Sequence, residues 1–128
     1  MGFDPSTTKP EIDFSGDAAP SDLVVEDLKE GDGREAKRGD TVSAHYVGVA
    51  HSTGEEFDAS WNRGAPLDFR LGVGQVIQGW DDGIVGMKVG GRRRLTIPAH
   101  LAYGDRGAGG AIKPGETLVF VVDLVDVR

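Results

Sequence analysis

Few side chains in this 128-residue chain could carry chemistry that needs a nucleophile or a metal. Cysteine is absent, which excludes disulfides, thiolate metal sites and a cysteine nucleophile. The three histidines, His45, His51 and His100, lack the spacing of metal ligands. Gly72-Val73-Gly74 is not a dinucleotide-binding fingerprint, because Ile77 stands where the third glycine would be. The sequence therefore predicts no bound metal and no cofactor.

One stretch, 76–84, puts an aromatic side chain where a binding pocket could form. Val76, Trp80 and Ile84 recur at every fourth position, which predicts a helix of about two turns with one apolar stripe. A helix this short is stable only when other elements pack against it. Because the segments on both sides have the pattern of strands, we expect a curved sheet around the helix. The Trp80 indole is then expected on the floor of the concavity that the sheet leaves open.

The elements that must position this helix are predicted to be strands. An extended segment, 56–71, is interrupted by a loop or bulge at 61–66, and glycine-rich residues 104–115 predict a flexible loop. Five β segments and one short helix indicate an α+β fold with the shape of a half-barrel, in which 117–127 is the longest strand. The other strands are predicted at 24–30, 41–50 and 92–97.

Two features have more than one interpretation. Arg92-Arg93-Arg94 begins a predicted strand, and its simplest interpretation is a solvated strand start. The alternative is a binding site for an anion or an acidic partner. Trp61 lies in a polar loop, where it is either a partial hydrophobic cover or an exposed contact for another chain.

The N-terminal residues differ in composition from the rest of the chain. Residues 1–22 contain five acidic side chains and one lysine, and they are rich in Pro, Ser, Thr and Gly. This composition predicts a flexible acidic tail ahead of one domain at 23–128. Residues 11–14 alternate in polarity, so the alternative is that they dock as a short edge strand.

The charge and hydropathy of the chain limit its partners and its location. The formal charge of −7 argues against a nucleic-acid-binding surface. No apolar run approaches the ~18 residues that span a bilayer, and the N-terminus lacks the basic start and apolar centre of a secretory signal. We therefore expect a cytoplasmic protein that binds neither membrane nor nucleic acid.

Several short motifs occur in a characteristic order along 23–127. They are Gly31-Asp32-Gly33, His45-Tyr46 with Gly48, Phe57-Asp58-Ala59-Ser60, Val76-Ile77-Gln78-Gly79-Trp80, Gly83, Met87, Val89-Gly90, Ala102-Tyr103-Gly104 and Leu118-Val119-Phe120. Together they resemble the FKBP-type peptidyl-prolyl cis/trans isomerases, the class that binds tacrolimus and rapamycin. The resemblance implies a five-stranded antiparallel half-barrel sheet wrapped around one short helix. It also implies a monomeric enzyme that rotates X-Pro bonds in unfolded or flexible, proline-containing polypeptides without a cofactor.

The resemblance further implies a pocket for a proline ring and a role for each matching residue. Trp80 would be the floor, and Asp58 would lie beside the twisting amide with Arg63 nearby. The N–H of Ile77 and the hydroxyl of Tyr103 would bind ligand carbonyl groups. The residues that the resemblance assigns to catalysis are Tyr46, Asp58, Trp80, Tyr103 and Phe120. Those that it assigns to substrate binding are Phe57, Arg63, Leu67, Val76, Ile77 and Ile112.

Three positions depart from the better-known members of that family. Leu67 stands where an aromatic residue is common, Ala108 where a histidine often lies, and Ala111 where a larger aliphatic residue often lies. The wall of the implied pocket and the flap over it (104–115) are therefore smaller, which bears on substrate preference and drug affinity. A non-catalytic prolyl-docking module, or a chaperone-like binding module, on the same fold is the alternative function.

Overall fold

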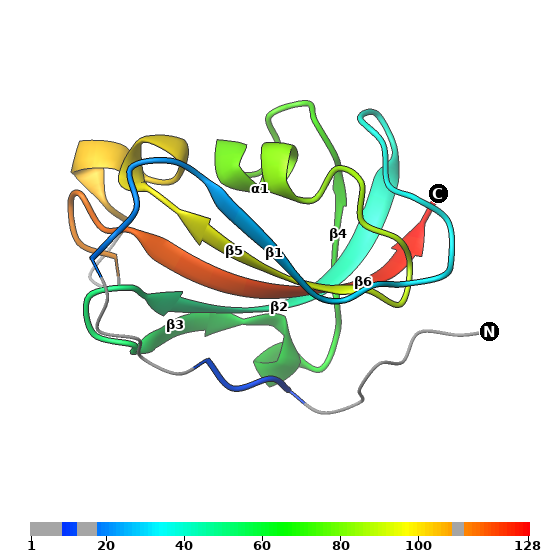
Figure 1. The fold of residues 1–128 in the computed structure, drawn as a ribbon, viewed down its shortest axis with the longest axis horizontal. Helices are drawn as coiled ribbons and strands as arrows, with labels where there is room; N and C mark the ends of the chain where they lie inside the picture. Colours follow the sequence, from blue (N-terminus) through cyan, green and yellow to red (C-terminus); the bar gives the residue numbers. More distant parts are fainter. Residues whose placement is uncertain (1–8, 13–17, 109–111) are drawn as a thin grey trace.

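The computed structural model describes residues 9–12, 18–108 and 112–128 (Figure 1). Within these residues, an antiparallel sheet curves around one short α-helix. The strands are β1 (Val24–Lys29), β2 (Thr41–Ala50), β3 (Glu56–Ala59), β4 (Leu67–Arg70), β5 (Arg92–Ile97) and β6 (Leu118–Val127). The helices are α1 (Gln78–Gly83) and the 3-10 helices η1 (Ser60–Arg63), η2 (Ala99–Leu101) and η3 (Gly104–Arg106). No helix of the described residues is long and apolar enough to cross a membrane.

The strands lie in the order β1-β5-β6-β2-β3, and β4 also pairs with β2. Residues 41–44 of β2 pair with β4, whereas 47–49 pair with β3. Because η1 interrupts the chain between β3 and β4, one predicted segment becomes two strands beside the same neighbour. The predicted α+β half-barrel is confirmed, with six strands in place of five. β6, expected to be the longest, has ten residues, as does β2.

Side chains alternate between the two faces of the sheet, as the sequence pattern predicts. On β2, Val42, Ala44 and Tyr46 belong to the main core beneath α1, while Val47 and Val49 belong to a second cluster on the outer face. Figure 1 shows α1 over one face of the sheet and η1 at the opposite side. The residues of β6 that were expected in the core are all buried there: Leu118, Phe120, Val122 and Leu124.

The helix α1 is shorter than the predicted 76–84. Ile77 is its N-cap, with φ −59° and ψ 150°, so the helix begins at Gln78 and ends at Gly83. Val76 and Ile77 therefore precede the helix. The prediction that Val76 is the first residue of a helical apolar stripe is wrong. The helix packs closely on β5. A Cβ added to Gly79 would lie 2.4 Å from Cγ2 of Ile97, a residue of β5.

The arginine run that opens β5 is paired with carboxylates. Arg92 makes a bidentate ion pair with Asp123 of β6, a side chain with no exposed surface. Arg93 makes an ion pair with Asp27 of β1 at 2.7 Å. The interpretation as a solvated strand start is therefore wrong for these two arginines, because the neighbouring strands place a carboxylate opposite each of them.

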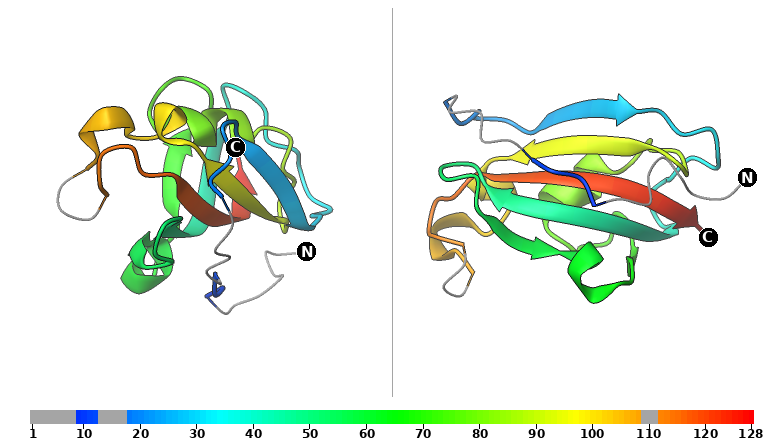
Figure 2. Two further views of the ribbon diagram at one scale, coloured as in Figure 1. Left: turned by 60° about the vertical axis from the view of Figure 1, so that its left-hand side comes forward. Right: turned by 90° about the horizontal axis from the view of Figure 1, so that it is seen from below.

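Residues 9–12 lie against the outer face of the sheet, away from α1 (Figures 1 and 2). Lys9 forms an ion pair with Glu56 at 2.7 Å and donates a hydrogen bond to Asn62 at 3.0 Å. Residues 11 and 12 form no strand, and residues 13 and 14 lie outside the described part of the chain. Of the predicted flexible tail, residues 1–8 and 13–17 are likewise outside it.

Trp61 of η1 covers the outer cluster, which agrees with the first of its two interpretations. It packs with Ile12 against Val47 and its neighbours, and its ring stacks on His45 at a centroid distance of 4.2 Å. The two tryptophans thus lie on opposite faces of the sheet, Trp61 outside and Trp80 within the main core.

Candidate functional site

A pocket of about 400 Å³ opens on the concave face of the sheet, beside α1. Binding sites for small organic groups in proteins have volumes of this order. Strands β2, β3, β4 and β6 contribute to it, together with α1, the segment ahead of α1 and the residue before η3. The lining residues are Tyr46, Phe57, Asp58, Leu67, Gln75, Val76, Ile77, Trp80, Tyr103 and Phe120.

Aromatic rings form the floor of this pocket. Trp80 is 4% exposed, and its ring meets those of Tyr46 and Phe120 edge to face, at centroid distances of 4.9 and 5.2 Å. Phe57 stands perpendicular to Phe120 at 5.5 Å. Gly48 makes room for both phenylalanines, because an added Cβ would lie 2.6 Å from Phe57 Cζ and 2.7 Å from Phe120 Cε1. The result is an apolar surface whose shape is fixed by ring-to-ring packing.

One wall of the pocket is polar. Asp58 accepts a hydrogen bond from the Tyr46 hydroxyl at 2.5 Å and another from Arg63 Nη1 at 2.9 Å. Arg63 Nη2 also donates to the Tyr46 hydroxyl oxygen at 2.7 Å, and the guanidinium lies 5.6 Å from the Tyr46 ring centroid. The turn of η1 after β3 brings Arg63 back to Asp58, so the interruption of the predicted strand serves to close this group.

The contacts within this group determine its charges. Burial raises the pKa of Asp58, but the hydrogen bonds from Tyr46 and Arg63 outweigh burial and bring that pKa below its ordinary value. Burial, with the hydrogen bond to Asp58, raises the pKa of Tyr46. Near pH 7 the aspartate is therefore ionised, and the tyrosine is a neutral hydrogen-bond donor.

The pocket brings together the residues that the sequence placed at the site, except Arg63 and Ile112. Arg63 reaches the pocket through its contacts with Asp58 and Tyr46. Ile112 is buried in the main core and does not line the pocket. Tyr103 lies at the rim with 41% of its surface exposed.

Of the positions that suggested a smaller wall and flap, Leu67 lies in the wall. Ala108 forms an isolated bridge with Ile112 across the predicted flap. Ala111 lies outside the described residues.

Gln75 lines the pocket but was not predicted from the sequence. Its side-chain oxygen accepts a hydrogen bond from the backbone N–H of Arg70, which folds the segment after β4 back onto that strand. The only signal in the sequence was its position directly before the Val76-Ile77 motif.

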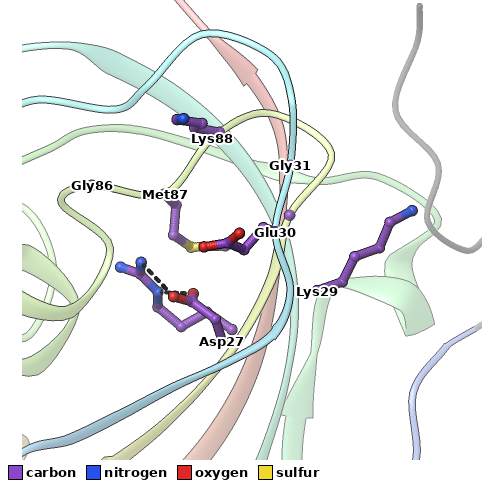
Figure 3. Close-up of a pocket in the computed structure, with 9 residues that line it drawn as sticks. Asp27, Lys29, Glu30, Gly31, Gly86, Met87 and Lys88 are labelled. Atoms are coloured by element: carbon purple, nitrogen blue, oxygen red, sulfur yellow. Dashed lines mark hydrogen bonds and ion pairs between the residues drawn. The ribbon is translucent and has the colours of Figure 1, made fainter.

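A second hollow, of about 70 Å³, lies beside β1 and the turn after α1 (Figure 3). It has room for about two water molecules. The dashed lines at Asp27 in Figure 3 mark its ion pair with Arg93. The lining also holds three charged side chains, Lys29, Glu30 and Lys88, and one apolar side chain, Met87, with glycines between them. Because this hollow is small and mostly polar, an organic ligand fits the larger aromatic pocket better. In the described residues, no three His, Asp or Glu side chains gather as a metal site.

Comparison with known families agrees with this geometry. The sequence model of the family described as FKBP-type peptidyl-prolyl cis-trans isomerase matches residues 32–125, which include every residue of the aromatic pocket. The chain belongs to this family. The chain is accordingly an FKBP-type peptidyl-prolyl cis-trans isomerase.

FKBP-type relatives share most of the chain with it. The FK506-binding protein of Streptomyces anulatus is 71% identical over 123 residues, covering 95% of this chain and 99% of the relative. The probable FK506-binding protein of Corynebacterium glutamicum is 52% identical over 117 residues, covering 91% and 97%.

Solved FKBP structures share the fold. The crystal structure of AtFKBP13 has a TM-score of 0.78 at 45% identity, covering 86% of this chain and 96% of that one. The crystal structure of FkpA from Escherichia coli has a TM-score of 0.76 at 40% identity, covering 90% and 54%. These likenesses confirm the FKBP-like α+β fold predicted from the sequence.

Proposed function

We propose that this isomerase binds the proline ring of a flexible polypeptide over Trp80 and accelerates rotation about the preceding peptide bond. The observation that carries the proposal is the apolar floor of Trp80, Phe57 and Phe120 next to the ionised carboxylate of Asp58. A five-membered apolar ring is of the right size and polarity for this floor. The amide ahead of the ring then lies beside the polar wall.

The chemistry needs neither a nucleophile nor a metal. The amide C–N bond has double-bond character, which sets a rotation barrier of about 18–20 kcal/mol. For X-Pro bonds the cis and trans forms are within about 1 kcal/mol, so the slow step is the rotation itself. Rotation breaks the conjugation and makes the amide less polar than the planar form. An apolar pocket that excludes water therefore favours the twisted amide over the planar one.

The polar wall acts electrostatically in this proposal. Tyr46 and Arg63 engage both oxygens of Asp58, so the carboxylate keeps its orientation while the amide twists. The N–H of Ile77 and the hydroxyl of Tyr103 bind carbonyl groups of the substrate on either side of the proline. In the described part of the chain, neither group donates a hydrogen bond to another residue.

We extend the proposal to macrolides such as tacrolimus and rapamycin, which would occupy the same pocket. Its support is that the two relatives described above bear the names FK506-binding protein and probable FK506-binding protein, and FK506 is tacrolimus. Leu67 is the wall position where this chain is expected to differ in drug affinity from members with an aromatic residue. Leu67→Tyr is the substitution that measures this difference.

The test is cis-to-trans isomerisation of a short Leu-Pro peptide with and without tacrolimus. Wild-type protein is compared with Asp58→Ala and Phe120→Ala, each expected to lose about tenfold or more in kcat/KM. Asp126→Ala is the matched control, because Asp126 is an exposed carboxylate on β6 that pairs with Arg128. Acceleration that tacrolimus abolishes and both variants reduce supports the proposal. Tight tacrolimus binding without acceleration would leave a prolyl-docking module. If the wild-type protein neither accelerates the reaction nor binds tacrolimus, both the isomerase and the docking function of the pocket are contradicted.

The location and the assembly state are part of the proposal. The protein acts as a cytoplasmic monomer that binds proline-containing polypeptides and neither nucleic acid nor membrane; its acidic charge of −7 supports the exclusion of nucleic acid. Cell fractionation and light scattering of the purified chain test location and assembly.

A further inference from the structure

We propose that Asp81 is a positioning residue for the substrate pocket. Its carboxylate holds the segment 72–77, which connects β4 to α1 and supplies Gln75, Val76 and Ile77 to the pocket. The inference rests on the proposed function of that pocket and adds a residue that does not line it.

The geometry of Asp81 is that of a clamp. The residue lies in α1 and is 7% exposed. Its Oδ1 accepts a hydrogen bond from the N–H of Gly72 at 2.8 Å, and its Oδ2 accepts one from the N–H of Gly74 at 2.9 Å. Hydrogen bonds from backbone N–H groups to an ionised carboxylate are among the strong ones in proteins. Both oxygens are thus committed to one turn of the chain.

Two other contacts hold that turn: the N–H of Arg70 donates to Gln75 Oε1 at 2.9 Å, and Arg38 lies against Gly72. Gly72 and Gly74 have φ angles of +83° and +81°, a region that glycine enters freely and also leaves freely. Val73 between them is 53% exposed, so no side-chain packing fixes the tip. Among the described residues, no other backbone N–H from 72 to 76 donates a hydrogen bond. Asp81 therefore accepts both backbone hydrogen bonds that the turn donates, and the bond from Arg70 to Gln75 adds one at its far end.

The clamp joins the wall of the pocket to its floor. Asp81 follows Trp80 directly in α1, and its own N–H donates to the carbonyl of Ile77 at 3.2 Å. One residue thus connects the helix that carries the indole floor to the turn that leads into Val76 and Ile77. If the clamp opens, the wall can move while the floor stays in place.

A loosened wall lowers the fraction of molecules that are ready to bind. The apparent Kd rises in inverse proportion to that fraction. Asp81→Ala removes both acceptors, and the nearly isosteric Asp81→Asn replaces one acceptor with a donor that faces a backbone N–H. We expect about a tenfold rise in the KM for a Leu-Pro peptide and in the Kd for tacrolimus, with kcat changed less than about twofold.

Two measurements on the full chain test the inference: the split between KM and kcat, and hydrogen exchange at the amides of 72–77. Asp126→Asn is the matched control, since Asp126 is an exposed carboxylate of β6 that pairs with Arg128 away from the segment. Faster exchange confined to 72–77 in both Asp81 variants, with raised KM, supports the inference. Wild-type exchange and KM in folded variants would overturn it, as would faster exchange spread evenly over β2 and β6. If wild-type protein neither isomerises the peptide nor binds tacrolimus, the proposed function fails, while the exchange data still decide whether Asp81 holds the segment.

Discussion

Gly48 and Asp58 are partners across β2 and β3, and they determine different properties of the pocket. Gly48 has no side chain, so the rings of Phe57 and Phe120 can meet over it. Among the described residues that line the pocket, Asp58 contributes the one carboxylate, and its contacts with Tyr46 and Arg63 keep it ionised. The shape of the floor and the charge of the wall therefore depend on residues that face each other in the sheet.

Gly48→Ala is expected to damage the pocket more than the fold. The new Cβ would press on both phenylalanine rings, and overpacking of this kind costs about 1–3 kcal/mol of stability. We expect kcat/KM for a Leu-Pro peptide to fall by about tenfold or more, because the displaced rings close the floor on which the proline lies. Thermal unfolding and the isomerase assay on the same sample measure both effects. A folded variant with wild-type activity would show that the rings do not form the binding surface.

The depressed pKa of Asp58 predicts the pH dependence of activity. Because the folded-state pKa lies below the ordinary 3.8, the carboxylate stays ionised, and kcat/KM is expected to be flat from about pH 5 to pH 8. Activity is lost only as the pH falls through that lowered value. Arg63→Ala removes a hydrogen bond that lowers the pKa of Asp58. The loss of kcat/KM at acid pH is therefore expected to begin at a higher pH in this variant than in the wild type. A pH profile of both proteins is the measurement, and an unshifted acid limb would contradict the assigned contact.

At the scale of the element, α1 is too short to be stable alone and depends on β5. Arg93 of β5 donates from Nη1 to the carbonyl oxygens of Gly83 at 2.9 Å and Val85 at 3.1 Å. These carbonyls lie at the C-terminus of the helix, where backbone acceptors otherwise lack partners. The ion pair with Asp27 holds the guanidinium in that position, so β1, β5 and α1 are joined by one side chain.

Adjacent arginines allow a controlled test of this connection. Arg93→Ala is expected to reduce the free energy of unfolding by about 2 kcal/mol, because it leaves helix carbonyls without a donor. Arg94→Ala removes only an exposed ion pair with Glu26 and is expected to cost less than about 1 kcal/mol. Urea unfolding of both variants gives the comparison. Equal losses would mean that the helix carbonyls do not need Arg93.

The sequence predicted strands better than it predicted connections. Alternation marks which side chains of β2 and β6 face the core, because the side-chain period of a strand is fixed by its backbone. It carries no information on which carboxylate lies opposite Arg92 or Arg93, since those pairs join distant parts of the chain. The start of α1 at Gln78 was missed because Val76 and Ile77 keep the apolar spacing of a helix outside it.

For the site, the sequence predicted which aromatic residues take part, but it did not predict the contacts between them. Spacing gave only the hypothesis that Trp80 lies on the floor of a concavity, and the family resemblance supplied the pocket roles of Trp80, Phe57, Tyr103 and Phe120. Gln75 and Asp81 were missed, because their roles depend on how the segment after β4 folds back onto its neighbours.

At the scale of the whole molecule, the outer face of the sheet is connected to the pocket through Ser60. Its hydroxyl oxygen accepts the N–H of Tyr46 at 2.7 Å and lies 2.8 Å from His45 Nδ1. Burial lowers the pKa of His45, and the nearby Asp123 opposes that shift only in part. A protonated His45 is thus less favourable in the folded state than in the unfolded state.

This difference predicts how stability changes with pH. A histidine whose folded-state pKa is lowered contributes stability that is complete above its ordinary value of 6.5 and is lost as the pH falls toward the folded-state value. Tm is therefore expected to decrease from about pH 7.5 to pH 5.5, and to decrease less in His45→Gln. Thermal melts of both proteins across this range test it. An identical pH dependence would show that His45 is not the group responsible.

The two tryptophans offer the most direct test of where a prolyl ligand binds, since they lie on opposite faces of the sheet. The measurement is a titration of ¹⁵N-labelled protein with tacrolimus or a Leu-Pro peptide, following the two indole N–H signals, with Trp61→Phe used to assign them. If the pocket over Trp80 is the binding site, the Trp80 signal shifts with ligand and the Trp61 signal stays in place. A shift of the Trp61 signal alone would place the ligand on the outer face and contradict the proposed site.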